Sequence, residues 1–379
     1  MKVYSLPPVR RAVPLRRGGS PSSHSMERFF GDRPVTFWSS GTAALSKAIS
    51  ECAILSGTRA PEVILPAYGC PDLVSACLQA STVPRLVDVA PSCWSFDYSR
   101  LSDYVTPNTV ALVAVNLLGV GDDAERLREF CNERGVPLIQ DSAQFLPRTE
   151  TGWPGDYVVL SFGRGKPLNL LHGGALVAPS GNAQCPSSVP ARFTLKRWLL
   201  ATRAAGLAFN MLTLPQLYGI LSALPGTGLG NVVYEPLGEA SMFPGAFSSV
   251  VNLAFDEYRL TPSYRRAIWA PLLEPLNAIG FEELRSPNGS SNAEPLRLAL
   301  LAPDRERRDS LMASLNRAGL GPSRFYGASL PDVTGIPQVV KAQGPFSNAA
   351  RLADRLLTLP THSLVTPRAV RTALEILAD

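Results

Sequence analysis

Histidine is scarce in this chain, and cysteine occurs without the paired spacing of a metal or redox motif. The three histidines, His24, His172 and His362, are far apart in the sequence, so a histidine-rich metal site is not expected. The six cysteines form no CxxC pair and stand mostly among apolar residues, which is typical of small buried side chains in a reducing cytoplasm. The sequence therefore argues against a zinc site and against a disulfide scaffold.

Signals for secretion and for nucleic-acid binding are also missing. The N-terminus is basic, with Arg10, Arg11, Arg16 and Arg17, but prolines interrupt it and no apolar core of a signal peptide follows. The net charge of +5 is not accompanied by an aromatic-basic patch. We expect a cytoplasmic protein that binds no nucleic acid, with an arm over residues 1–32 that is solvated or crosses to a partner subunit.

What is present is the pattern of a globular α/β protein. The chain has 379 residues, which is longer than one hydrophobic core usually supports, so we expect two domains. Between residues 33 and 180, short apolar runs alternate with helical patterns, which indicates βαβ units and a mainly parallel sheet buried on both faces. The predicted strands are residues 35–38, 63–66, 85–89, 110–117, 136–140, 157–162 and 175–178.

The second half of the chain predicts a smaller α+β domain. From about residue 246 helical patterns follow one another, with a single strand expected at 296–302. The sequence thus divides into a large domain over residues 33–245 and a small one over 246–379. The predicted helices of the small domain are 247–260, a stretch ending at 278, 304–318, 348–357 and 366–377.

An apolar insertion at about 191–234 interrupts this plan after a loop at 179–190. Residues 204–234 carry no charge, and Pro215 divides them into two short helical pieces. A membrane span needs about 20 continuous apolar residues, and Asn210, Pro215 and Gln216 stand in the middle. Three interpretations remain: a buried helical hairpin at a subunit interface or over the active site, a surface that makes peripheral membrane contact or binds a lipid-like substrate, and a true span.

Polar residues stand at the ends of several predicted strands, where open α/β sheets bind ligands. After the first strand, Ser40, Gly41 and Thr42 open directly into a helix, and such a helix N-terminus can bind an anion. A plain N-cap is the alternative. Asp141 ends a buried strand and needs a partner, which can be a ligand cation, a salt bridge or a helix cap; Gln144 follows within reach of the same ligand.

A third strand ends at Ser161 and leads through a glycine-rich turn to Lys166. A lysine near another cation and low-dielectric walls has a lowered pKa, which favours imine formation, and Arg164 is the candidate neighbour. The alternative is a surface lysine in a turn. Gly173 and Gly174 follow, and paired glycines permit close backbone approach.

Together these segments resemble the DegT/DnrJ/StrS (sugar) aminotransferase family, most closely over residues 33–180. Ser40-Gly41-Thr42-Ala43 resembles the family's cofactor-phosphate loop, and Asp141-Ser142-Ala143-Gln144 is similar to its D-x-A-[HQ] element. Ser161 stands five residues before Lys166, as the family's phosphate-binding serine stands before its Schiff-base lysine. Gly173-Gly174 and the late Leu359-Pro360-Thr361-His362 segment also resemble family motifs.

The resemblance implies a fold type I transferase that depends on pyridoxal 5'-phosphate, with a seven-stranded-type sheet. It implies that Lys166 carries the cofactor as a Schiff base, that Asp141 pairs with the pyridine nitrogen, and that Gln144 contacts the phenolic oxygen. The implied phosphate contacts are Ser40, Gly41, Thr42 and Ser161. The aromatic residue that stacks on the ring is assigned to Tyr68, although counting from Pro66 places Cys70 at that position.

The implied activity is amino transfer from a small-molecule donor such as glutamate to a carbonyl acceptor, within a homodimer. The acceptor is a nucleotide-linked sugar or, given the insertion, something more apolar. His172 replaces a family glutamate, and the expected cross-subunit segment reads only Phe247-Ser248-Ser249. A cofactor-binding protein with other chemistry or a regulatory role is one alternative. A dinucleotide-binding oxidoreductase is another, because Gly119-Val120-Gly121-Asp122-Asp123-Ala124 fits G-x-G-x-x-A.

Overall fold

The computed structural model describes most of the chain. The described residues are 4–9, 12, 25–149, 152–181, 192–223, 232–243, 246–260, 267–289 and 295–378. Arg10, Arg11, Arg16 and Arg17 of the arm, Cys185, and most of the predicted 179–190 loop lie outside these ranges.

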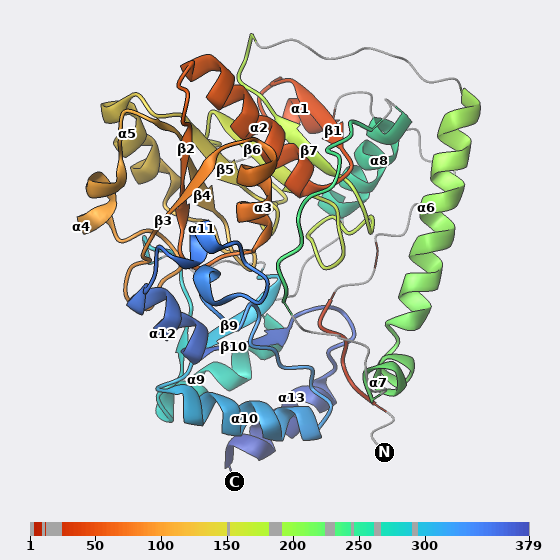
Figure 1. Cartoon of the computed structure of the whole chain (residues 1–379). Helices are drawn as coiled ribbons and strands as arrows, with labels where there is room; N and C mark the ends of the chain where they lie inside the picture. Colours follow the sequence, from red (N-terminus) through yellow and green to blue (C-terminus); the bar gives the residue numbers. More distant parts are fainter. Residues whose placement is uncertain are drawn as a thin grey trace.

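A seven-stranded sheet forms the centre of the molecule, in the order β1-β7-β6-β5-β4-β2-β3 (Figure 1). The strands from β3 to β6 run parallel to their neighbours, whereas β7 is antiparallel to both β6 and β1. This confirms the predicted mainly parallel sheet. The strands are β1 (Val35–Trp38), β2 (Glu62–Pro66), β3 (Val83–Val87), β4 (Thr109–Val115), β5 (Leu138–Asp141), β6 (Tyr157–Ser161) and β7 (Gly174–Val177).

Helices cover both faces of this sheet, as the period-two alternation of its buried side chains requires. Val63 and Val159 pack into one hydrophobic cluster with the helices α2 and α3. Ile64 packs on the other face with α5, and Val158 on that face with α1 and α8. The helices are α1 (Ser25–Phe29), α2 (Gly41–Ser56), α3 (Asp72–Gln79), α4 (Tyr98–Leu101), η1 (Ser102–Tyr104), α5 (Ala124–Arg134) and α8 (Ala246–Leu260).

A second, three-stranded antiparallel sheet lies in the C-terminal part, in the order β10-β9-β8. The predicted helix 348–357 is too long, because α12 ends at Arg355 and the apolar run Leu356–Pro360 pairs with β9 as β10. The elements are η2 (Ala267–Trp269), α9 (Ala270–Ala278), β8 (Glu282–Glu283), β9 (Arg297–Leu301), α10 (Arg305–Arg317), η3 (Leu330–Asp332), α11 (Gln338–Lys341), α12 (Ser347–Arg355), β10 (Leu356–Pro360) and α13 (Pro367–Ala378).

The N-terminal segment 4–9 packs along this small sheet instead of extending into solvent. Leu6 is fully buried, and its N–H donates to the Gly319 carbonyl at 2.8 Å. His362 Nε2 donates to the Pro7 carbonyl at 2.8 Å, and Arg297 Nη1 donates to the Pro8 carbonyl at 2.5 Å. The solvated interpretation of the arm is therefore wrong for this segment.

The apolar insertion forms two helices, α6 (Arg192–Leu212) and α7 (Pro215–Ala223), and Pro215 begins the second as the sequence predicted. Helix α6 runs along the outer edge of the molecule (Figure 1). Trp198 anchors it, with its ring 5.4 Å from that of Phe247 in α8 and 5.8 Å from that of His172. No single described helix is both long and apolar enough to cross a bilayer; α6 and α7 meet that test only as a pair bent by 74°.

Candidate active site

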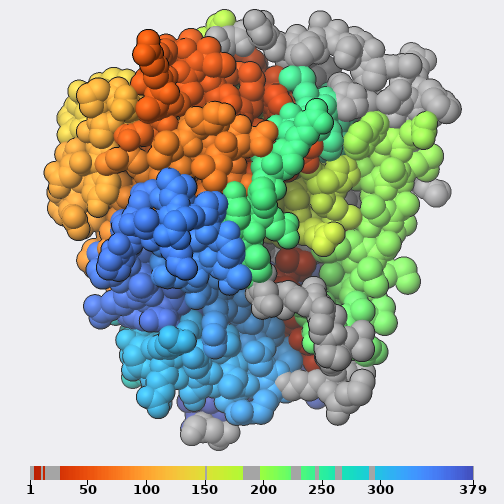
Figure 2. Space-filling model, in the orientation of Figure 1, coloured from red at the N-terminus to blue at the C-terminus, as the bar shows by residue number. Residues whose placement is uncertain are grey.

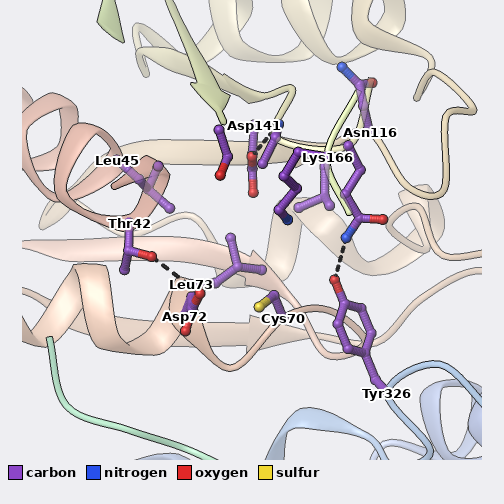
Figure 3. A pocket seen from close by; sticks show the side chains of 14 residues that line it. Thr42, Leu45, Cys70, Asp72, Leu73, Asn116, Asp141, Lys166 and Tyr326 are labelled. Carbon is purple, nitrogen blue, oxygen red and sulfur yellow. Dashed lines mark hydrogen bonds between the residues drawn. The ribbon is translucent and has the colours of Figure 1, made fainter. Parts of the chain in front are cut away.

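A cavity lies where β4, β5 and β6 end and α2 begins (Figure 3). This is the carboxyl edge of the parallel strands, where the sequence predicted a ligand. It brings together six of the predicted residues, which come from the start of α2 and from the ends of β5 and β6 with the segments that follow them. The lining residues are Gly41, Thr42, Leu45, Cys70, Asp72, Leu73, Val115, Asn116, Asp141, Ala143, Gln144, Ser161, Lys166 and Tyr326.

Two glycines permit the close crossing of strands that shapes this edge. A Cβ on Gly41 would lie 2.7 Å from Ser161 Cβ, and a Cβ on Gly174 would lie 2.5 Å from the Gly41 nitrogen. Both contacts are closer than side chains permit, so the paired segments need glycine here. The start of α2 therefore lies directly against the end of β6.

Asp141 is a buried carboxylate that faces the cavity. Its Oδ1 accepts a hydrogen bond from the Ala143 N–H at 2.9 Å. Burial raises the pKa of Asp141, while the Ala143 N–H and the charge of Lys166 act in the opposite direction. Among the described residues, no ion pair joins this carboxylate to a basic side chain. A cationic group bound in the cavity would therefore be stabilised beside it.

Lys166 extends into the same cavity from a tight turn after β6 (Figure 3). The backbone N–H of Lys166 donates to the Gly163 carbonyl at 3.3 Å. The preceding Gly165 has a φ of 76°, a conformation that favours glycine. A Cβ on Gly165 would lie 2.9 Å from Val9 Cγ1, so the N-terminal segment supports this turn. Arg164 is exposed and does not line the cavity, so it does not fill the predicted role of cationic neighbour.

Gln144 is held from both sides by the fold. Its Oε1 accepts from the Leu118 N–H at 3.0 Å, and its Nε2 donates to Tyr326 Oη at 2.6 Å. Tyr326 comes from the segment before η3, far along the chain, and burial raises its pKa. The sequence offered no signal for Tyr326, because nothing in its neighbourhood marks it as a site residue.

Cys70, and not Tyr68, lines the cavity after β2. Tyr68 is buried behind it, with its ring 5.6 Å from that of Tyr326. Burial raises the pKa of Cys70 to about 12, so its thiol is neutral and small. The cavity lining favours Cys70 over Tyr68 as the residue that faces a bound ring; stacking by Tyr68 remains a prediction without support from the lining.

The two hydroxyl groups at the start of α2 have different partners. Ser40 Oγ accepts from the Ala43 N–H at 3.0 Å, which is the N-cap alternative, and Ser40 does not line the cavity. Thr42 does line it, and its hydroxyl donates to Asp72 Oδ2 at 3.2 Å. Asp72 was not predicted from the sequence.

Asn116 was also not predicted, although a polar residue that ends a buried strand is a usable signal. It follows β4, its Nδ2 donates to Ser142 Oγ at 2.7 Å, and its Oδ1 accepts from the Asp122 N–H at 2.8 Å. These two bonds tie Asn116 to the residue after Asp141 and to the loop before α5, and its amide lies at the cavity wall.

The alternative dinucleotide site does not have the required geometry. Asp123 caps the N-terminus of α5, where a pyrophosphate would need free N–H groups. The adjacent Asp122 places a second carboxyl group at the same end, and burial raises its pKa to about 6. Among the described residues, no cluster of histidine, cysteine, aspartate and glutamate could hold a metal ion.

Residues 23–190 and 248–378 match the DegT/DnrJ/EryC1/StrS aminotransferase family, and these two segments make up more than half of the chain. The chain belongs to this family. The unmatched residues between the two segments are those of α6, α7 and the stretch after them. The family model thus does not include the insertion.

Curated relatives match only part of the chain. The L-glutamine:2-deoxy-scyllo-inosose aminotransferase of Streptoalloteichus tenebrarius is 32% identical over 37% of this chain and 34% of its own length. The 3-amino-5-hydroxybenzoate synthase of Amycolatopsis mediterranei is 30% identical over 44% of this chain and 45% of its own length. The aligned parts thus span less than half the length of these relatives.

Similarity to solved structures extends over nearly the whole chain. The structure of NtdA from Bacillus subtilis with bound cofactor PMP has a TM-score of 0.66 and 18% identity, and the match covers 96% of this chain and 79% of the other. At this identity the similarity shows a shared fold, which agrees with the α/β architecture predicted from the sequence.

Proposed function

We propose that this chain is an aminotransferase that depends on pyridoxal 5'-phosphate. The observation that carries the proposal is that Lys166 and Asp141 line one cavity, and that the buried Asp141 has no ion-pair partner among the described side chains. An amine and an unpaired buried acid at one sheet edge suit an aldehyde cofactor whose ring nitrogen is protonated.

The residues present fit this cofactor. Asp141 would face the pyridine nitrogen, Lys166 Nζ would bind the aldehyde carbon, and Thr42 with Ser161 would hold the phosphate beside the start of α2. Gly41 has no side chain between the start of α2 and Ser161, which lets these two parts of the cavity lining lie close together. When bound, the cofactor acts as an electron sink for the bond that is broken at the substrate carbon.

The protein's own groups would position and move protons. The carboxylate of Asp141 would keep the proton on the ring nitrogen, because burial makes an uncompensated negative charge unfavourable there. The Lys166 amine, once released by the amino donor, would carry the proton between the substrate carbon and the cofactor carbon. Gln144 would hold its amide toward the phenolic oxygen side, since Leu118 and Tyr326 fix its orientation.

We further propose glutamate or glutamine as amino donor and a sugar-like carbonyl compound as acceptor. The names of the curated relatives support both classes, and they include an L-glutamine-dependent and a glutamate-dependent aminotransferase. Leu45, Leu73 and Val115 give the cavity an apolar side, which favours an acceptor with an apolar face. A homodimer and a cytoplasmic location are parts of the proposal that rest on the family resemblance and on the sequence.

Replacement of the lysine tests the proposal. Purified wild-type protein with pyridoxal phosphate should absorb in the visible and lose that absorbance when glutamate or glutamine is added. Lys166→Ala should lack both the absorbance of the covalently held cofactor and the response to donor. Lys341→Ala, which changes an exposed lysine, should behave as wild type.

The outcomes separate the candidate functions. Intact amino transfer in Lys166→Ala would end the proposal. Visible absorbance in the wild-type protein with no response to any amino donor would instead favour the alternative of a cofactor-binding protein with other chemistry or a regulatory role.

A further inference from the structure

The outward face of α6 is apolar, which reverses the usual pattern of a surface helix. Leu200 is 65% exposed, Leu207 is 67% exposed and Met211 is 61% exposed. Leu207 lies two turns after Leu200, and Met211 lies one turn after Leu207, so the three share one face of α6. Between them on the same face are four exposed alanines, and the face ends with the exposed Leu212. The alanines are Ala201, Ala204, Ala205 and Ala208.

Polar residues of α6 point inward instead. Thr202 and Thr213 are buried, and Asn210 exchanges hydrogen bonds with the backbone of Ala12 on the N-terminal segment, accepting at 2.8 Å and donating at 3.4 Å. Trp198 and Asn210 on the inward side therefore hold the helix in place, whereas the leucines and Met211 of the outward side remain exposed among the described residues.

Helix α7 extends this exposed apolar surface around a bend. It follows α6 at an angle of 74°, and Leu217 and Ile220 on it are 40% and 39% exposed. Figure 2 shows the residues of α6, in light green, at the edge of the molecule. We call Leu200, Leu207, Met211, Leu212, Leu217 and Ile220 the insertion face.

The charge carried by the insertion itself has one sign. Residues 191–234 contain four lysines and arginines and no aspartate or glutamate. Arg197 is exposed one turn before Leu200 on the outward side of α6. An apolar helix face next to cationic residues is the pattern of a helix that lies in the interface of an anionic membrane.

We propose that the insertion face docks on an anionic lipid bilayer, with α6 and α7 lying in the headgroup region and not crossing it. The bend excludes a straight span, while the exposed leucines supply the apolar contact and Arg197 meets the lipid phosphates. The insertion lies outside the residues that match the family, so this contact is a property of this chain and not of the shared aminotransferase body. The proposal does not depend on the chemistry of the cavity.

Electrostatic repulsion makes a second copy of the chain a less favourable partner for the insertion face than an anionic membrane. A two-fold interface would bring two identical cationic segments together, and residues 191–234 offer no acidic side chain to pair with them. A lipid surface supplies the missing negative charge.

Vesicle flotation of the full-length purified protein tests the proposal. Wild-type protein should float with vesicles of equal phosphatidylglycerol and phosphatidylcholine, and should float far less with pure phosphatidylcholine or in high salt. The double variant Leu207→Glu with Met211→Glu should bind at least about tenfold more weakly, because both carboxylates would face anionic headgroups. Arg197→Glu should also weaken binding to the anionic vesicles.

A matched control uses two equally exposed apolar residues elsewhere. Ile54 and Leu55, each 75% exposed at the end of α2, are changed to glutamate and should leave flotation unchanged. Unchanged thermal unfolding of all variants shows that they remain folded. Wild-type protein that stays in the aqueous phase with every vesicle overturns the proposal. A double variant that floats as wild type also overturns it. If the double variant floats as wild type but sediments as a smaller species, the face contacts a second copy of the chain instead of a membrane.

Discussion

Burying the ionised Asp141 side chain is unfavourable, so this residue lowers the stability of the folded protein when no ligand is bound beside it. Burial raises its pKa in the folded chain, so the folded state binds the proton more tightly than the unfolded state does. The ionised form therefore destabilises the cofactor-free protein, increasingly as the pH rises from the unfolded value of about 3.9 through the folded pKa.

Asp141→Asn should separate this residue's effect on stability from its effect on activity. Without cofactor, the variant should unfold at a higher temperature than wild type at pH 7.5, and the difference should shrink as the pH falls below about 4, because the wild-type carboxyl then becomes protonated in both states. With cofactor, amino transfer should slow by at least about a hundredfold. Calorimetry and stopped-flow absorbance measure the two effects. A rate near that of wild type would remove Asp141 from its assigned role.

Strand β7 and helix α2 show the demands that packing makes at the level of elements. Both begin with a glycine, Gly174 in β7 and Gly41 in α2, and the two segments touch so closely that no side chain fits between them. All seven strands predicted between residues 33 and 180 overlap strands of the large sheet, because apolar runs specify buried strands. The predicted helix 348–357 wrongly included the first two residues of β10, because a short apolar run carries no period that distinguishes helix from strand, and pairing with β9 decided it.

Gly174→Ala should disturb the site without touching a ligand. Its Cβ would lie 2.5 Å from the Gly41 nitrogen and push α2 away from Ser161. We expect a loss of about 1–3 kcal/mol in the free energy of unfolding, together with weaker cofactor binding. Gly238→Ala is the matched control, because a Cβ there meets nothing within 4 Å. If urea unfolding gives the same stability for both variants, the close contact between β7 and α2 does not require glycine at position 174.

Across the whole molecule, the cavity is completed by a residue from the C-terminal half. Tyr326 Oη accepts a hydrogen bond from Gln144 Nε2, although the two residues are 182 positions apart in the sequence. The N-terminal segment contacts both the small sheet and the turn that carries Lys166. Parts of the chain that lie at both ends and in the middle of the sequence therefore hold one site.

A double-mutant cycle measures that long-range link. Tyr326→Phe should lower the free energy of unfolding by about 1 kcal/mol, because one buried hydrogen bond is lost. Combined with Gln144→Ala, the two changes should be less than additive, by about 1 kcal/mol, since both remove the same contact. Additive effects in urea unfolding would show that the 2.6 Å contact contributes nothing.

The sequence by itself determined the mainly parallel sheet and identified Lys166, Asp141, Gln144, Ser161 and the Gly41-Thr42 turn, because strand periodicity and polar residues at strand ends are local features of the chain. Only the tertiary structure decided that Tyr326, Asp72 and Asn116 join them, and that Cys70 faces the cavity in place of Tyr68. It also decided that the apolar side of α6 points outward. Contacts between segments far apart in sequence, and the direction in which a helix face is turned, depend on packing that no local pattern encodes.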